Sequence, residues 1–231
     1  MKNPMRLVRT IFFAAITGLF LSGCADGIGR GGIKEGTIEY KAVPVDPNDD
    51  MAAIAPSKMT VKFKNNLFNA EMAAGFGMAN MSFVSDPGKK EFLSMVNLIG
   101  QKYASKMGPD SVKYYNHYFP DYDVVETPEK KMIAGFNCNK ALIKFKDGSP
   151  AITIYYTKEI KIDHPNWSNA YYKVDGVLME YELKKFGLAL RFTASTVTES
   201  TIDDNVFVLN TEYKKIPNYQ LEIMFKELDS N

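Results

Sequence analysis

The residues that could do chemistry are few and scattered. The 231-residue chain has two histidines, His117 and His164, and two cysteines, Cys24 and Cys138. No HxxxH, CxxC or HExxH spacing occurs, so the sequence gives little support for a transition-metal site. A nucleophile would need a nearby base, and a hydrolase would therefore need one of the two histidines in a pocket beside it. We expect a protein that is not an enzyme and needs no metal or cofactor, with a hydrolase as the alternative.

Cys24 has the sequence context of a lipid attachment site. The chain starts with a basic segment that carries Lys2, Arg6 and Arg9 and no acid, and the apolar run IFFAAITGLFL follows. The run ends at Leu21-Ser22-Gly23-Cys24, which is similar to the bacterial lipobox. The thiol is needed for the thioether bond to diacylglycerol, and the small side chains before it suit the signal peptidase. Residues 1–23 are therefore predicted to be a lipoprotein signal peptide.

Acylation at Cys24 also predicts where the protein works. More than one acyl chain anchors a protein stably to a membrane. The next residue is Ala25, and not the Asp that resembles an inner-membrane retention signal. The segment 24–35, which begins glycine-rich, is predicted to be the lipidated cysteine and a flexible tether, and 36–231 a single domain. We expect an outer-membrane lipoprotein that faces the periplasm and meets the membrane through its lipid anchor.

The charge and composition exclude other classes of protein. There are 28 Lys and Arg against 27 Asp and Glu, and the signal peptide holds three of the bases, so the mature charge is −2. A nucleic-acid binder is expected to be strongly basic, so no nucleic-acid partner is expected. The hydrophobic share of 45% excludes a disordered chain. The acidic segment 46–50 lacks the glycine and final glutamate of an EF-hand loop and is predicted to be a solvated turn.

Alternation of apolar and polar residues runs through the mature chain and predicts β-strands. We expect eight to ten of them. The clearest signals are three single strands at residues 37–42, 81–84 and 101–105, two hairpins at 139–157 and 177–194, and a turn at Asn65-Asn66.

Two segments have helical spacing instead. Pro109 is placed to occupy the first turn of one helix, and Pro217 precedes a second apolar stripe near the C-terminus. Many antiparallel hairpins with few helices predict a mainly β protein of the α+β class, with a large curved antiparallel sheet that helices cover on one face.

Methionine and phenylalanine are concentrated in the first half of the mature chain. Ten methionines remain after removal of the signal peptide, and methionine suits adaptable apolar surfaces. Such residues line either a cavity for an acyl chain or an ordinary core, and composition alone favours the core. The candidate lining residues are Met59, Val61, Phe63, Phe68, Met72, Met81 and Phe83.

The segment from Val125 to Pro217 carries a family resemblance. It reads ETPEKKMIAGFNCNKALIKF, ITIYYTKEI, GVLMEYEL, FTASTVTE and NVFVLNTEYKKI in order, and PSKMTVKFKNN precedes it. This order is similar to a family of lipoproteins without assigned function that is common in the Bacteroidetes. That family resembles the LolA/LolB lipoprotein-carrier superfamily. The resemblance implies an open antiparallel half-barrel whose mouth is closed by helices and whose apolar interior holds acyl chains.

Two functions therefore remain open. The first is a lipid-anchored protein that binds a hydrophobic ligand in a half-barrel cavity lined by the seven residues above. The second is a structural or partner-docking lipoprotein of the envelope whose interior is filled. The volume and lining of the largest hollow distinguish the two.

Overall fold

One large β-sheet organises the protein, whose computed structural model describes residues 32–185 and 188–229. The predicted signal peptide, Cys24 and residues 25–31 of the predicted tether lie outside the described residues. Twelve strands are found in the described part of the chain, in the order β12-β6-β5-β4-β3-β2-β1-β11-β10-β9-β8-β7. Neighbouring strands are antiparallel, except that β12 runs parallel to β6. The prediction of a mainly β protein with one large antiparallel sheet is confirmed.

The twelve strands exceed the eight to ten that were expected, and several are longer than their sequence signals. Their bounds are β1 Glu35–Pro44, β2 Lys58–Lys64, β3 Leu67–Ala74, β4 Ala79–Asp86, β5 Glu91–Leu98, β6 Gln101–Met107, β7 Tyr122–Ile133, β8 Phe136–Phe145, β9 Ile152–Thr157, β10 Val177–Lys185, β11 Leu188–Glu199 and β12 Lys214–Lys215.

The local signals for strands and turns are confirmed. The two predicted hairpins are β8–β9 and β10–β11, although residues 186–187 of the second turn lie outside the described part. Asn65 and Asn66 both have positive φ, at 46° and 71°, in the turn between β2 and β3. Strand β7 has no clear sequence signal, because Thr127-Pro128-Glu129-Lys130 at its centre interrupts the alternation of apolar and polar residues. At the same place the pairing register with β8 shifts.

The part of the chain that the structure describes also holds two α-helices and three short 3-10 helices. Their bounds are α1 Pro109–Asn116, α2 Asn218–Asp229, η1 Asp50–Ile54, η2 Gly75–Gly77 and η3 Asp204–Phe207. Proline stands in the first turn of α1, as predicted. None of the helices in residues 32–185 and 188–229 is long and apolar enough to cross a membrane.

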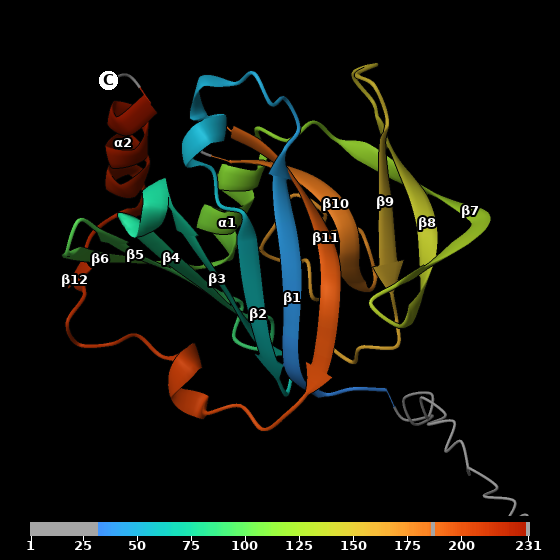
Figure 1. Ribbon diagram of the computed structural model, residues 1–231, viewed down its shortest axis with the longest axis horizontal. Helices are drawn as coiled ribbons and strands as arrows, with labels where there is room; N and C mark the ends of the chain where they lie inside the picture. The colour runs from blue at the N-terminus through green and yellow to red at the C-terminus, as the bar shows by residue number, and fades with distance from the viewer. Residues whose placement is uncertain (1–31, 186–187, 230–231) are drawn as a thin grey trace, which may run out of the picture.

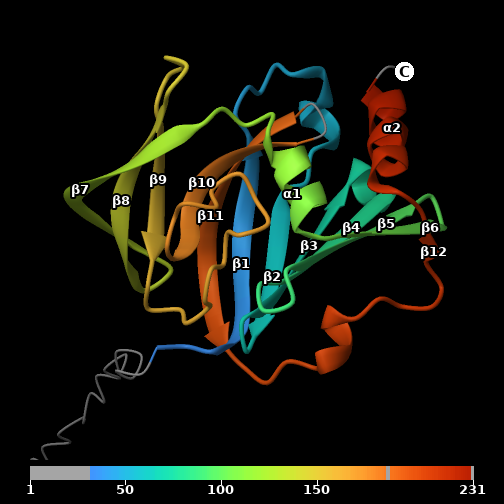
Figure 2. The same ribbon diagram turned by 180° about the vertical axis from the view of Figure 1, so that it is seen from behind.

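The two faces of the sheet are covered by different segments (Figures 1 and 2). We call the face that carries Met81 and Phe83 the inner face; α1, α2 and the connection from β9 to β10 pack on it. This connection, residues 158–176, is here named the strap, and Figure 2 shows it in front of the central strands. The outer face carries Val84 and Met95, and the segment around η3 packs on it through Phe207.

The ends of the sheet also differ. β1 runs from Glu35 to Pro44, and the strand ends that lie beside Pro44 form the end of the sheet opposite Glu35 (Figure 1). This distal end includes η1, η2 and the turn between β5 and β6, as the antiparallel order requires.

The predicted tether overlaps the folded part of the chain. Ile33 is 2% exposed and forms a parallel bridge with Ile160 of the strap, and β1 starts at Glu35. The first residues of the predicted 24–35 segment that the structure describes are therefore part of the domain.

Candidate functional site

The seven candidate lining residues lie together on the inner face. β2, β3 and β4 pair in register, which places Met59, Met72 and Met81 in one row across the sheet. Phe63 lies opposite Phe68 in a parallel row. Val61 and Phe83 occupy the row between these two, joined through Ala70 of β3. The alternation in the sequence thus identified residues that share a face.

These seven residues are packed against other side chains. Five of them are buried, and Phe68 and Met72 are half-buried. Met59, Val61 and Phe63 belong to a cluster with residues of β1, β10 and β11, and Phe63 has no exposed surface. Met81 and Phe83 belong to a second cluster, where they pack with Val112 of α1 and Leu221 of α2.

The strap fills the remaining space on the inner face. Ile160 and Ile162 enter the cluster around β1 and β2, Trp167 packs against the cluster under α1 and α2, and Tyr171 and Val174 enter a third cluster with β8 and β9. A single connection therefore contributes apolar side chains to all three inner-face clusters. Sequence reasoning missed it because its residues show no period of two or of 3.6.

Polar groups hold the middle of the strap against β4. The indole nitrogen of Trp167 donates a hydrogen bond to the Ser85 hydroxyl at 2.7 Å, and the hydroxyls of Ser85 and Ser168 are 3.0 Å apart. Asn166 closes the strap on itself, because its side-chain nitrogen donates to the carbonyls of Val174 and Gly176, both at 2.9 Å. Since buried polar groups need partners, these bonds let the strap enter the core.

Aromatic rings hold the C-terminal part of the strap. Tyr171 has no exposed surface and contacts Phe119 and Tyr181 edge to face, at centroid distances of 5.4 and 6.0 Å. Its hydroxyl donates to the carbonyl of Glu182 on β10. The strap ends at Gly176, where φ is +151° and a Cβ would lie 2.6 Å from the Tyr156 ring, so no larger residue fits without a shift.

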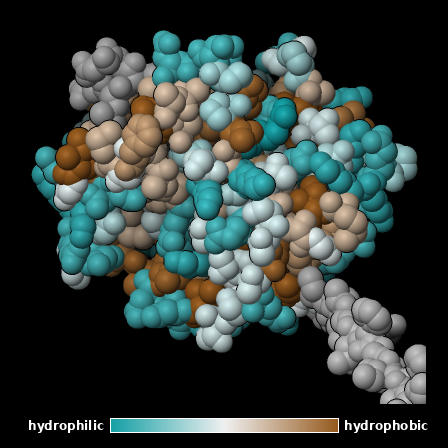
Figure 3. All heavy atoms as spheres, in the orientation of Figure 1, coloured by the Kyte–Doolittle hydropathy of each residue, from teal (hydrophilic) through white to brown (hydrophobic). Residues whose placement is uncertain are grey.

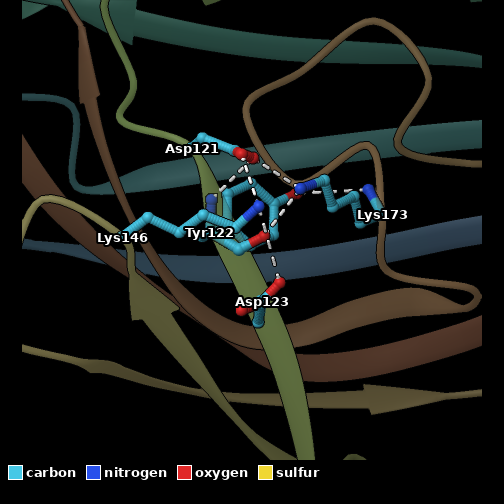
Figure 4. Close-up of polar contacts among 5 residues, drawn as sticks. All are labelled: Asp121, Tyr122, Asp123, Lys146 and Lys173. Carbon is cyan, nitrogen blue, oxygen red and sulfur yellow. Dashed lines mark hydrogen bonds and ion pairs between the residues drawn. The ribbon is translucent and has the colours of Figure 1, made fainter.

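A charged cluster ties the strap to β7 and β8 (Figure 4). Lys173 of the strap donates to Asp121 Oδ1 and to the Tyr122 carbonyl, both at 2.6 Å, and its ammonium lies 4.9 Å from the centre of the Tyr122 ring. Lys146 approaches Asp121 Oδ2 at 2.8 Å from the opposite side. The hydrogen bonds from Lys146 and Lys173 hold the pKa of the Asp121 carboxyl well below its usual range.

Acid should therefore release this end of the strap. The folded-state pKa of Asp121 lies below its unfolded value of about 3.9, so its contribution to stability is complete above that value and is lost as the pH falls through the folded pKa. We expect the free energy of unfolding, measured by urea denaturation from about pH 5 to about pH 2, to fall less steeply in Asp121→Asn than in the wild type. Asp123→Asn, 3.9 Å from Lys146, is the matched control. Parallel pH profiles for the wild type and Asp121→Asn would contradict the expectation.

Two hollows lined by described residues lie away from the candidate lining. One of about 330 Å³ is a shallow surface on α1, lined by Asp110, Lys113, Tyr114 and His117. The other, of about 490 Å³, lies at the distal end, between residues 52–57 and the Ala73–Gly77 turn, with Ala42 and Pro44 beside it. Neither hollow is lined by any of the seven predicted residues.

The nucleophile and base candidates are separately placed. Cys138 on β8 has no exposed surface, and burial raises the pKa of its thiol to about 11, so the thiol is protonated near neutral pH. His117 follows α1 and His164 lies in the strap, and both side chains are exposed. Among the described residues, no group of three or more histidine, cysteine, aspartate and glutamate side chains is placed to hold a metal ion.

The distal end exposes apolar side chains that sequence reasoning did not single out. Phe76 of η2 is 93% exposed and Ile99 of the β5–β6 turn is 73% exposed. The backbone of Ile99 donates a hydrogen bond of 2.8 Å to the carbonyl of Met78, which joins the two turns. The available signal was local: both residues stand beside glycine in a turn, where polar residues are usual.

Comparison with known proteins shows the fold alone. No family model matches the chain, and no curated protein sequence matches it. Two solved structures of PNGF-II are similar, one in space group P21 with a TM-score of 0.51 and 15% identity, and one in space group C2 with a TM-score of 0.52 and 14% identity. Each match covers 83% of this chain. It covers 33% of the PNGF-II chain in the P21 structure and 32% in the C2 structure. The chain thus spans about a third of the PNGF-II chain.

Proposed function

We propose that this protein is a non-enzymatic outer-membrane lipoprotein, acylated at Cys24, that works by docking a protein partner in the envelope. The observation that carries the proposal is the filled inner face. All seven candidate lining residues are buried or half-buried beneath the strap and the helices. An interior occupied by the protein's own side chains leaves the outer surface as the place of interaction.

We also propose that the sheet forms an open half-barrel. In Figures 1 and 2 the strands β3–β6 turn away from the upright strands β1, β9 and β11, and α1 lies within the bend. This arrangement supports an open half-barrel related to the LolA/LolB carriers. In this protein the strap would take the place of a carried lipid.

A second candidate function rests on the distal hollow. Its volume of about 490 Å³ falls within the range of about 300–1,000 Å³ that is typical of ligand pockets. Most residues around it are alanine, proline, isoleucine or phenylalanine. A hydrophobic ligand such as an acyl chain would bind there and not on the predicted lining.

Native mass spectrometry of the protein after gentle detergent extraction distinguishes these functions. The docking proposal expects the mass of the acylated chain alone and no saturable binding of a fluorescent fatty acid. A stoichiometric additional lipid would overturn it. Loss of that lipid in Ala73→Asp, a change at the distal hollow, with retention in the exposed control Tyr219→Ser, would establish the second function.

A further inference from the structure

One side of α1 and of the turn that follows it carries aromatic and charged residues together. Asp110, Lys113, Tyr114, His117 and Tyr118 follow the spacing i, i+3, i+4, i+7 and i+8, which places them on one side of a helix. All five side chains are exposed, Tyr114 by 59% and Tyr118 by 71%. Figure 2 shows α1 on the side of the molecule that is turned toward the viewer. We name these five residues the α1 platform.

The α1 platform is held in place from behind. Val112 is buried in the cluster under α1 and α2, and Tyr115 packs against the same cluster. The ring of Tyr115 meets the ring of Tyr114 edge to face, with the centroids 5.2 Å apart. Directly after the turn, Phe119 contacts Tyr171 of the strap. The exposed rings therefore stand on a fixed helix, so that a ligand would lose little affinity to the ordering of the protein.

Three aromatic rings form a continuous surface on the α1 platform. The centroid of the His117 ring lies 5.0 Å from that of Tyr114 and 3.9 Å from that of Tyr118. A side-chain hydrogen bond with Tyr114 raises the pKa of the Tyr118 phenol and links the two tyrosines. The shallow hollow of about 330 Å³ lies against this surface, because Tyr114 and His117 line it together with Asp110 and Lys113. The platform thus offers aromatic rings and charged groups to the same open space.

Folding of the helix does not explain these residue types. At exposed helix positions lysine and glutamate favour the helix more than tyrosine and histidine do. Asp110 and Lys113 stand three positions apart, where an ion pair would stabilise the helix. Neither forms an ion pair or a side-chain hydrogen bond with another described residue. Both side chains therefore keep their hydrogen-bonding capacity for a ligand.

The groups of the α1 platform select the chemistry of its ligand. The face of an aromatic ring is electron-rich and attracts C–H groups, which carry a slight positive charge. Beside the rings Asp110 accepts hydrogen bonds, Lys113 donates them, and His117 does either. One acid and one base give the platform no excess charge with which to hold an anion or a cation.

An apolar ligand suits this surface poorly. An acyl chain would cover the phenol and imidazole groups and the two charges without replacing their hydrogen bonds to water, which is costly. The exposed side chains at the distal end are of another kind, because Figure 3 shows brown and tan, hydrophobic spheres over η1 and η2. A sugar ring has C–H groups on its faces and hydroxyls around its edge, so it matches both the rings and the polar groups of the α1 platform.

We infer that the α1 platform binds a neutral glycan chain. Sugar rings of the chain stack on Tyr114 and Tyr118, and sugar hydroxyls form hydrogen bonds with Asp110, Lys113 and His117. The hollow is shallow and open, which suits a chain that passes over the surface better than a single enclosed sugar. This site goes beyond the proposed docking function and does not depend on it.

Titration calorimetry with neutral hexasaccharides tests the inference. The mature chain, made without residues 1–23 and with Cys24→Ser so that no detergent is needed, is titrated with cellohexaose, maltohexaose and chitohexaose. We expect saturable binding of at least one of them, with a Kd of about 1 mM or below. Its affinity should not fall when the salt concentration rises from about 0.05 to about 0.5 M, because the ligand has no charge to be screened.

Substitutions locate the bound glycan. Tyr114→Ser and Tyr118→Ser should each weaken binding at least about tenfold, because each removes a ring on which a sugar stacks. Tyr118→Phe keeps the ring and should bind within about threefold of the wild type. Phe76→Ser removes an exposed aromatic ring from η2 and is the matched control, which should bind as the wild type does. All four side chains are exposed, so the melting temperatures should stay within about 2 °C of the wild type.

Other results would overturn the inference. No saturable binding of any of the three sugars would exclude a neutral glycan, and unchanged binding in both serine variants would place the sugar elsewhere. A Tyr118→Trp variant that binds no sugar, but whose fluorescence shifts to the blue on phosphatidylcholine vesicles, would identify a lipid surface as the occupant. None of these results bears on the filled inner face, which native mass spectrometry tests separately.

Discussion

Replacement of Tyr171 by alanine should lower the free energy of unfolding by about 3–5 kcal/mol, the usual cost of removing a large buried aromatic side chain. Tyr171 has no exposed surface, and its ring contacts Phe119 and Tyr181. The substitution would leave a cavity beneath the strap and would remove the hydrogen bond to the carbonyl of Glu182. Urea denaturation of the wild type and the variant at one pH measures the loss.

The neighbouring tyrosine provides the control. Tyr172 is 53% exposed and its ring makes one edge-to-face contact with Tyr122, at a centroid distance of 5.8 Å, so Tyr172→Ala should lower the free energy of unfolding by no more than about 1.5 kcal/mol. Tyr171→Phe keeps the ring and removes only the hydroxyl, so it should cost about 0.5–1.5 kcal/mol. Equal losses in Tyr171→Ala and Tyr172→Ala would show that the strap is not part of the core, and the docking proposal would then lose its main support.

Replacement of Cys24 by serine should abolish attachment of the protein to the outer membrane. A serine hydroxyl in this position cannot form the thioether to diacylglycerol, so neither acylation nor cleavage of the signal peptide should follow. We expect no incorporation of labelled palmitate and no protein in the outer-membrane fraction. Loss of attachment should be complete, because stable anchoring needs more than one acyl chain and the variant would carry none.

Cys138→Ser is the matched control for this experiment. Cys138 is the other cysteine of the chain, and its thiol is fully buried and protonated near neutral pH. The Cys138→Ser protein should keep both the palmitate label and its place in the outer membrane. Palmitate label that persists in Cys24→Ser would refute the lipoprotein assignment, and label in the inner-membrane fraction of the wild type would refute the predicted sorting.

The strands and their faces could be predicted because their signal is local. A period of two in residues 59–72 was enough to place Met59, Val61 and Phe63 on one face. The turn at Asn65-Asn66 and the helix that begins at Pro109 depend on the conformational preferences of single residues. Strand β7 escaped prediction because charged residues and Pro128 hide its alternation, and pairing with β8 supplies the missing stability.

What lies on the inner face was decided only by the tertiary structure. The hydrogen bond from Trp167 to Ser85 joins residues that are 82 positions apart, and no local sequence pattern in the strap predicts this contact. The turns that carry the exposed side chains of Phe76 and Ile99 come together for the same reason, because Ile99 bonds the carbonyl of Met78 only when β4 and β5 pair. The sequence by itself therefore determined which residues are apolar and which share a face. Whether that face is hollow or filled depended on the path of an irregular connection, whose position follows from contacts distant in the chain.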